Sequence, residues 1–245
     1  MRRWPFFNGL YWSLIVLVKK LLKSKILDWQ EIDTVLLDMD GTLLDLNFDN
    51  HFWKEFVPAE YARRHQLTLE RARQILVPRF AEMEGRLEWY CLDYWSDALG
   101  LDIAGLKKEI SGLIAVLPHV IDFLQAVKES SRKAILVTNA HRDSLDIKMD
   151  KTRLNVFFDQ IVCSHDYGLA KEQPGFWEKL QQQHIFDSQR TLLVDDSLAV
   201  LNSAREFGIK YLISISRPDS QAAKRQITDF QSIEDFRELL PVPAV

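Results

Sequence analysis

Five short apolar runs recur along the chain, and each has the length of a β-strand. They cover Thr34–Asp38, Lys133–Thr138, Gln160–Ser164, Thr191–Val194 and Tyr211–Ile215. Most are apolar at consecutive positions rather than at alternate ones, which is typical of strands covered on both faces of a parallel sheet. The pattern therefore predicts an α/β fold built on a parallel sheet with helices on both faces.

Helical patterns lie between these runs. In Ser197–Phe207 the apolar side chains form one stripe, with Ser197 placed to cap the helix and Gly208 placed to end it. Pro118–Ser131 predicts another helix, which leads into the second strand. The last strand is followed by a polar tail with a helix-like pattern.

The interval between the first two predicted strands, from about Leu44 to Ser131, is much longer than one crossover helix requires. Three helical patterns fill it, at Phe52–Arg64, Leu69–Met83 and Leu87–Leu99. We therefore expect a helical domain over residues 45–117, inserted after the first strand. Residues 28–44 and 118–245 would form the core, and residues 1–27 a separate N-terminal extension.

Charge is distributed unevenly along the chain. The formal net charge is −4, yet residues 1–25 contain six Lys and Arg and no acid, which leaves 25 basic against 35 acidic residues in the remainder. An acidic body of this kind does not attract nucleic acid polymers. The two cysteines, Cys91 and Cys163, give no disulfide framework and no metal-binding spacing, and we expect reduced thiols in a cytoplasmic protein. The six histidines show no ligand spacing either, although His141 falls near the rim of the expected site.

The N-terminal extension contains an apolar run, Trp4–Val18, between basic residues. As a helix its 15 residues would span about 22 Å, which is shorter than the roughly 30 Å core of a bilayer. Three interpretations fit: an interfacial anchor, a marginal membrane span, or a true start of the protein near Leu27. We favour the last, so we expect membrane contact only if the extension is real.

Polar residues follow the ends of the predicted strands. Asp38 and Asp40 end the first, Thr138 and Asn139 the second, and Asp195 and Asp196 the fourth, while Lys171 lies in the loop after the third. Ligands of open parallel sheets bind beyond the carboxyl ends of the strands, so these side chains should converge. Carboxylates gathered in this way repel one another and favour a bound cation, and all-oxygen ligands favour Mg²⁺. With Lys171, such a site suits a phosphoryl group.

The order of these motifs, DxDGT, Thr, an isolated Lys and DD, resembles the haloacid dehalogenase superfamily of phosphatases. The resemblance covers nearly the whole chain from residue 30 on. It implies a Rossmann-like parallel sheet with a helical cap inserted after the first strand.

The resemblance also implies residue roles. Asp38 would attack phosphorus and carry the phosphoryl group as an aspartyl-phosphate, and Asp40 would act as general acid and base. Thr138, Asn139 and Lys171 would bind the phosphate, Lys171 also balancing the charge of Asp38. Magnesium would be held by Asp38, Asp195, Asp196 and the main-chain carbonyl of Asp40. Asp196 would ligate through water or orient the site, and it could equally cap the following helix.

Three stretches, residues 45–53, 89–95 and 164–172, look like those of bacterial GMP/IMP nucleotidases. The similarity implies hydrolysis of small phosphomonoesters, the purine nucleoside 5′-monophosphates. Phe48 and Asn50, near the junction of core and cap, are candidates for substrate contact. The aromatic residues Trp53, Trp89, Tyr90, Tyr94 and Trp95 could stack a purine or simply form the core of the cap.

Other activities stay open on the sequence alone. A phosphatase for sugar phosphates or phosphoglycolate, or a phosphomutase, would use the same core motifs. A dehalogenase is disfavoured, because it attacks carbon and has no use for the acid Asp40 or for Mg²⁺. A non-catalytic scaffold is disfavoured because no motif residue is missing.

Overall fold

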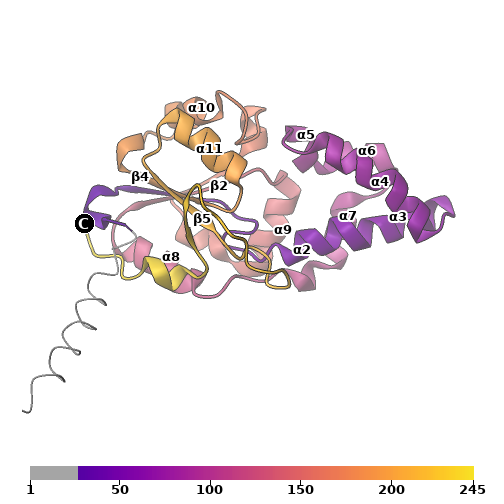
Figure 1. Ribbon diagram of the computed structural model, residues 1–245, viewed down its shortest axis with the longest axis horizontal. Helices are drawn as coiled ribbons and strands as arrows, with labels where there is room; N and C mark the ends of the chain where they lie inside the picture. The colour runs from indigo at the N-terminus through magenta and orange to yellow at the C-terminus, as the bar shows by residue number, and fades with distance from the viewer. Residues whose placement is uncertain (1–26) are drawn as a thin grey trace, which may run out of the picture.

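A six-stranded parallel sheet organises the protein (Figure 1). The computed structural model describes residues 27–245. The strands follow the order β3-β2-β1-β4-β5-β6. Their bounds are β1 Thr34–Leu37, β2 Lys133–Thr138, β3 Gln160–Cys163, β4 Thr191–Asp195, β5 Tyr211–Ile215 and β6 Gln231–Ile233.

The five predicted strands are confirmed to within one residue at each end. The helix-like interpretation of the tail was wrong. Strand β6 lies there and pairs in parallel with β5, Ile213 opposite Gln231, and a 3-10 turn, Phe236–Leu239, follows it. The three residues Gln231–Ile233 are too few, and too polar at the start, to give a recognisable apolar run.

Consecutive side chains of each central strand enter two different cores. Val35 and Leu37 of β1 belong to the core on one face of the sheet, whereas Leu36 belongs to the core on the other. All three are fully buried. Burial on both faces explains why the strands appear as continuous apolar runs in the sequence.

Helices cover both faces. Helices α8 (Val120–Glu129) and α9 (Arg142–Thr152) contribute side chains to the first core. Helices α10 (Phe176–Gln183) and α11 (Leu198–Phe207) contribute to the second. The predicted ends of α11 are confirmed, since the Ser197 hydroxyl accepts a hydrogen bond from the Val200 N–H and Gly208 follows in a left-handed conformation.

The helices between β1 and α8 form a separate body, which we call the helical insertion (residues 47–113); it occupies the right of Figure 1. Its members are α2 (Asn47–His51), a π-helical turn (Phe52–Phe56), α3 (Val57–His65), α4 (Leu69–Met83), α5 (Leu87–Tyr90), α6 (Leu92–Leu99), α7 (Ile103–Glu109) and a 3-10 turn (Ser111–Leu113). It has its own core, which includes Phe52, Leu76, Trp95 and Ile103. The predicted helix Leu87–Leu99 is interrupted at Cys91, and α7 was not predicted.

The two connections of the helical insertion run side by side. Leu44 and Val116 form an antiparallel bridge. The Asp45 N–H donates to the Ala115 carbonyl at 2.9 Å, and the Leu117 N–H donates to the Leu43 carbonyl at 2.9 Å. The chain therefore enters and leaves the helical insertion through one paired ribbon.

The expectations for the N-terminal extension fall outside the described residues. Within residues 27–245, none of the helices is long and apolar enough to cross a membrane.

We expect Leu36→Ala to lower the free energy of unfolding by about 2–5 kcal/mol, because it removes a fully buried side chain from the centre of the sheet. Urea unfolding followed by tryptophan fluorescence would measure it. The matched control is Ile121→Ala on α8, 51% exposed, which should change stability by less than about 0.5 kcal/mol. Equal effects of the two substitutions would contradict the second core.

Candidate active site

The carboxylates predicted from the strand ends meet between β1 and β4, where the order in which successive strands join the sheet reverses. Strands β2 and β3 extend the sheet on one side of β1, and β4 and β5 extend it on the other. Asp38 directly follows β1, and Asp195 ends β4. Such a switch point is where open α/β sheets bind ligands.

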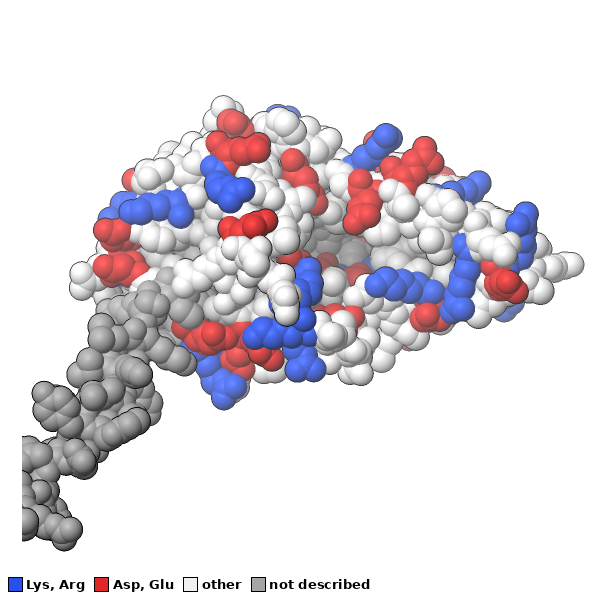
Figure 2. Space-filling model, in the orientation of Figure 1, with Lys and Arg blue, Asp and Glu red and all other residues white. Residues whose placement is uncertain are grey.

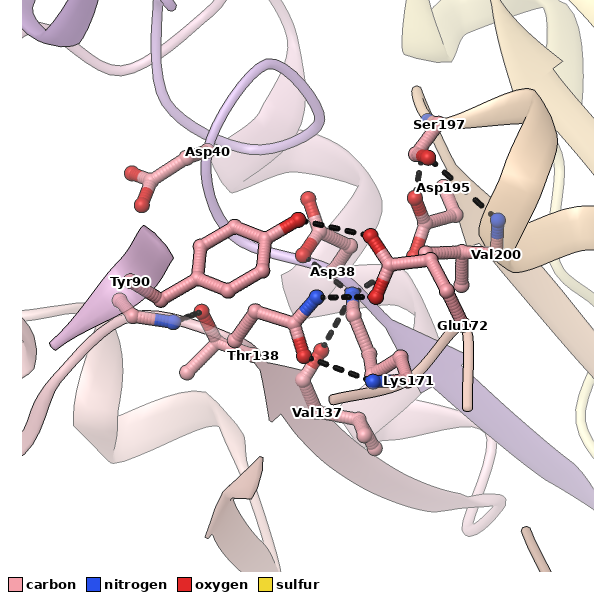
Figure 3. Close-up of polar contacts among 12 residues, drawn as sticks. Asp38, Asp40, Tyr90, Val137, Thr138, Lys171, Glu172, Asp195, Ser197 and Val200 are labelled. Atoms are coloured by element: carbon pink, nitrogen blue, oxygen red, sulfur yellow. Dashed lines mark hydrogen bonds and ion pairs between the residues drawn. The ribbon is translucent and has the colours of Figure 1, made fainter. Parts of the chain in front are cut away.

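Lys171 joins these two carboxylates (Figure 3). Its Nζ lies 2.6 Å from Asp38 Oδ1 and 2.7 Å from Asp195 Oδ2, and it also donates to the Val137 carbonyl at 3.1 Å. The residue is 2% exposed. Burial alone would lower the pKa of Lys171, but the carboxylates of Asp195 and Asp38 outweigh burial and raise it. The lysine is therefore a fixed positive charge within the site.

Asp195 and Asp196 are held by contacts from different elements. Asp195 Oδ1 accepts the Ser197 N–H at 2.9 Å, and Asp196 Oδ2 accepts from Arg225 at 3.1 Å. Burial raises the pKa of Asp196 to about 7, with Asp38 adding to the effect, and burial also raises the pKa of Asp195. Helix α11 is capped by Ser197, so the alternative role of Asp196 as its cap does not apply.

A divalent cation fits these carboxylates. One oxygen each from Asp38, Asp195 and Asp196 lie within 4.8 Å of one another. Their crowding in a buried position raises the free energy of the charged forms, and a cation would relieve it. Three carboxylates without nitrogen or sulfur form a donor set suited to a hard ion.

Gly41 explains the glycine of the DxDGT motif. Its φ is +82°, and a Cβ built on it would lie 2.8 Å from the Asp196 Cγ. Any other residue would be strained in this conformation and would displace the Asp196 carboxylate. The loop after β1 can approach β4 so closely only with glycine at this position.

Asp40 belongs to a second charged network, away from the contacts of Lys171 (Figure 3). Lys148 Nζ on α9 lies 2.7 Å from Asp40 Oδ1 and 2.7 Å from Asp49 Oδ2. Lys107 Nζ on α7 lies 2.5 Å from Asp49 Oδ1. We call Asp40, Asp49, Lys107 and Lys148 the inner charge network. It connects the sheet to the helical insertion through two almost fully buried lysines.

The two acids of the inner charge network have opposite pKa shifts. Burial raises the pKa of Asp40 to about 6, against the opposing charge of Lys148. Burial would also raise the pKa of Asp49, but Lys107 and Lys148 outweigh it and lower this pKa. Asp40 can therefore exchange a proton near neutral pH, whereas Asp49 stays ionised.

Thr138 and Asn139 follow β2 as predicted. The Thr138 hydroxyl is buried and accepts the Ala140 N–H at 3.0 Å. The Asn139 side chain accepts the Lys171 N–H at 2.9 Å and donates to Glu172 at 2.8 Å. Both ends of this amide are thus used to hold the loop that carries Lys171.

A cavity of about 440 Å³ lies over these groups, in the hollow between the sheet and the helical insertion (Figure 2). Trp53, Phe80, Trp89 and Tyr90 supply aromatic walls. Among the predicted site residues, the cavity is lined by Asp38, Asp40, Asn50, Thr138, Asn139, Lys171, Asp195 and Asp196. Its size and lining suit a small organic molecule with an anionic group.

Of the other predicted contacts, Phe48 and Trp95 lie outside the cavity, whereas Asn50 lines it. Phe48 is not part of the cavity lining; it is 2% exposed and packs beneath the ammonium groups of Lys107 and Lys148, 5.0 and 5.4 Å from its ring centre. Trp95 is buried in the core of the helical insertion. The Asn50 side chain donates to Asp219 at 2.7 Å.

Several residues of the site were missed in the sequence. They include Asp49, Lys107 and Lys148, which are far apart along the chain. In the sequence each looks like a charged residue on the exposed face of a helix. Glu172 accepts the Tyr90 hydroxyl at 2.7 Å, a contact between the sheet side and the helical insertion. Only the position of Glu172 next to Lys171 could have suggested it.

The sequence is similar to known hydrolases. The family model described as haloacid dehalogenase-like hydrolase matches residues 32–208. The GMP/IMP nucleotidase YrfG of Escherichia coli (strain K12) is 40% identical over 87% of this chain and 96% of that protein. The pyrophosphatase PpaX of Halalkalibacterium halodurans is 23% identical over 74% of this chain and 82% of that protein.

Solved structures agree on the fold. The crystal structure of a HAD phosphatase from Thermococcus onnurineus superposes with a TM-score of 0.72 at 20% identity, covering 87% of this chain and all of that chain. At this identity the likeness concerns the architecture, which is that of a parallel sheet with a helical cap inserted after its first strand.

We expect Asp49→Asn to lower the free energy of unfolding by about 3–5 kcal/mol, because it leaves two buried ammonium groups with one fewer counter-charge. Because the folded pKa of Asp49 is lowered, its stabilising effect is complete above the unfolded pKa of about 3.9 and is lost as the pH falls below it. The difference in free energy of unfolding between wild type and variant, measured by chemical denaturation, should therefore become smaller at acidic pH. The control Asp150→Asn, whose side chain is 84% exposed, should be nearly neutral, and the network would be refuted if both variants behaved alike.

Proposed function

The chain belongs to the haloacid dehalogenase-like hydrolases, and we propose that it is a Mg²⁺-dependent phosphatase of purine nucleoside 5′-monophosphates, GMP and IMP. The observation that carries the proposal is the sequence identity to a protein named as a GMP/IMP nucleotidase. The two sequences are 40% identical over 87% of this chain and 96% of that protein. We propose further that residues 45–117 act as the domain that selects the substrate.

The cavity supports a substrate with an aromatic base. Trp53, Phe80 and Trp89 line it from the helical insertion, and Asp38, Asp195, Asp196, Thr138 and Lys171 line it from the sheet. Aromatic side chains stack favourably on planar rings, and the charged end of the cavity can receive the phosphate. A purine nucleotide has both parts in one molecule.

Asp38 is the proposed nucleophile. Its Oδ1 is held by Lys171, so the carboxylate is fixed in direction while its other oxygen can attack phosphorus. The new Asp38–phosphorus bond forms as the bond from phosphorus to the nucleoside oxygen breaks. Water then attacks the aspartyl-phosphate, which releases inorganic phosphate and restores the carboxylate.

Asp40 is the proposed acid and base. Its pKa of about 6 makes the protonated form available to donate to the leaving nucleoside oxygen. The carboxylate that results can take a proton from the attacking water in the second step. Lys148 fixes its position and limits how far burial raises the pKa.

The remaining residues bind charge. Asp38, Asp195 and Asp196, with the main-chain carbonyl of Asp40, would hold Mg²⁺, which when bound stabilises negative charge on the phosphoryl group. Lys171 and the Thr138 hydroxyl would hold phosphate oxygens. Asn139 contributes by positioning the Lys171 loop.

Asp38→Asn should reduce turnover of GMP by several orders of magnitude while leaving the circular dichroism spectrum unchanged, because it removes the group that accepts phosphorus. Asp40→Asn should cost roughly 10²–10⁴-fold, the usual contribution of a general acid or base. Steady-state phosphate release measures both, with Asp150→Asn as the matched substitution that should retain activity. Unchanged phosphate release by the Asp38 variant would rule out the mechanism.

Across a panel of phosphomonoesters in saturating Mg²⁺, kcat/KM should be highest for GMP and IMP. Sugar phosphates, phosphoglycolate and pyrimidine nucleotides should be turned over less efficiently, because they lack a purine to stack on the aromatic wall. Excess EDTA should abolish turnover and added Mg²⁺ should restore it. Equal or better turnover of sugar phosphates would contradict the nucleotidase proposal and favour a sugar phosphatase.

A further inference from the structure

Three side chains with nitrogen and sulfur donors meet beside the cavity, and no step of the proposed mechanism uses them. Cys91 lies between α5 and α6 of the helical insertion, His141 precedes α9 after β2, and His165 lies in the 3-10 turn Ser164–Tyr167 after β3. One ligand atom from each of the three lies within 4.8 Å of the others. The cluster therefore spans the boundary between the helical insertion and the sheet.

Two ring nitrogens of this cluster are buried without a hydrogen-bond partner among residues 27–245. They are Nδ1 of His141 and Nε2 of His165. The two rings pack edge to face, with centres 5.1 Å apart. A buried polar atom without a hydrogen-bond partner destabilises the fold and calls for a specific explanation.

A carboxylate lies near each ring nitrogen of His141. Its Nδ1 makes no hydrogen bond and lies 3.7 Å from the Asp143 carboxylate, and its Nε2 lies 3.6 Å from the Asp93 carboxylate on α6. Histidines that bind a metal through one nitrogen usually direct the other nitrogen to a carboxylate, which fixes the ring and its tautomer. Asp93 stands two residues from Cys91, so one short segment would supply a ligand and an orienting group.

We propose that Cys91, His141 and His165 bind a transition-metal ion of the Zn²⁺ class, which fastens the helical insertion to the sheet. One thiolate and two imidazoles suit Zn²⁺, with water in the fourth position. The set is chemically distinct from the all-oxygen site of Asp38, Asp195 and Asp196, which suits Mg²⁺.

The site would act on the cavity. Tyr90, adjacent to Cys91, already contacts Glu172 next to Lys171. An ion held by ligands from both sides adds coordinate bonds across the same boundary and resists separation of the helical insertion from the sheet. If the phosphatase function proposed above holds, Zn²⁺ slows turnover by retaining product.

Cobalt(II) provides a direct test, because it replaces Zn²⁺ and gives an intense charge-transfer absorption when bound to a thiolate. We expect the full chain, titrated in saturating Mg²⁺, to show this absorption at one equivalent of Co²⁺ and to lose it when Zn²⁺ is added. Cys91→Ser should abolish the absorption, whereas Cys163→Ser, the matched control at the other cysteine, should retain it. His165→Ala should weaken Co²⁺ binding at least about tenfold, with His184→Ala as its control.

The proposal is overturned if the wild type shows no thiolate absorption, or if Cys91→Ser retains it. The measurement does not require activity, so its failure is distinct from failure of the phosphatase proposal. In the activity assay, inhibition by Zn²⁺ at saturating Mg²⁺ should be relieved by Cys91→Ser and by His165→Ala. Inhibition that persists unchanged in both variants would place the inhibitory Zn²⁺ at the carboxylates instead and would refute the fastening role.

Discussion

The ion pairs of Lys171 with Asp38 and Asp195 are the constraint on which the site depends. Two carboxylates from neighbouring strands cannot be buried at one edge of a sheet unless a positive charge accompanies them. Lys171 supplies that charge from a third strand's loop, and Asn139 and Glu172 hold the loop in place. The same ion pair fixes the direction of the Asp38 carboxylate, so in the proposed mechanism the group that allows the carboxylates to be buried also orients the nucleophile.

The inner charge network extends the same principle to the helical insertion. Asp49 lies between two buried lysines, one from α7 and one from α9, and the second of these also contacts Asp40. Each cation is shared, so the position of the helical insertion is linked electrostatically to the proposed general acid. Residues other than the proposed acid and base can in this way influence the proposed proton-transfer step.

Much of the sheet could be predicted from the sequence, because strands buried on both faces give unbroken apolar runs that end in polar residues. The glycine of the DxDGT motif also predicted a tight turn correctly, because the turn at Gly41 leaves no space for a Cβ beside Asp196. Strand β6 was not predicted, because three residues are too few to show a periodic hydrophobic pattern. A different reason applies to Lys148, Asp49 and the Cys91–His141–His165 cluster, which were not predicted either. Only tertiary packing brings these residues together, and their spacing along the chain gives no indication of it. The residue roles carried over from the family remain proposals, although most of those residues line one cavity.

The paired ribbon at Leu44 and Val116 has an evolutionary consequence. Because the two ends of the helical insertion lie roughly one strand spacing apart, about 5 Å, the intervening segment can be exchanged as a unit through two neighbouring junctions. The sheet need not be rethreaded, and the carboxylate edge stays intact beneath whatever replaces the segment. If the helical insertion selects the substrate as proposed, recombination at this junction changes specificity and leaves the residues at the sheet edge unchanged.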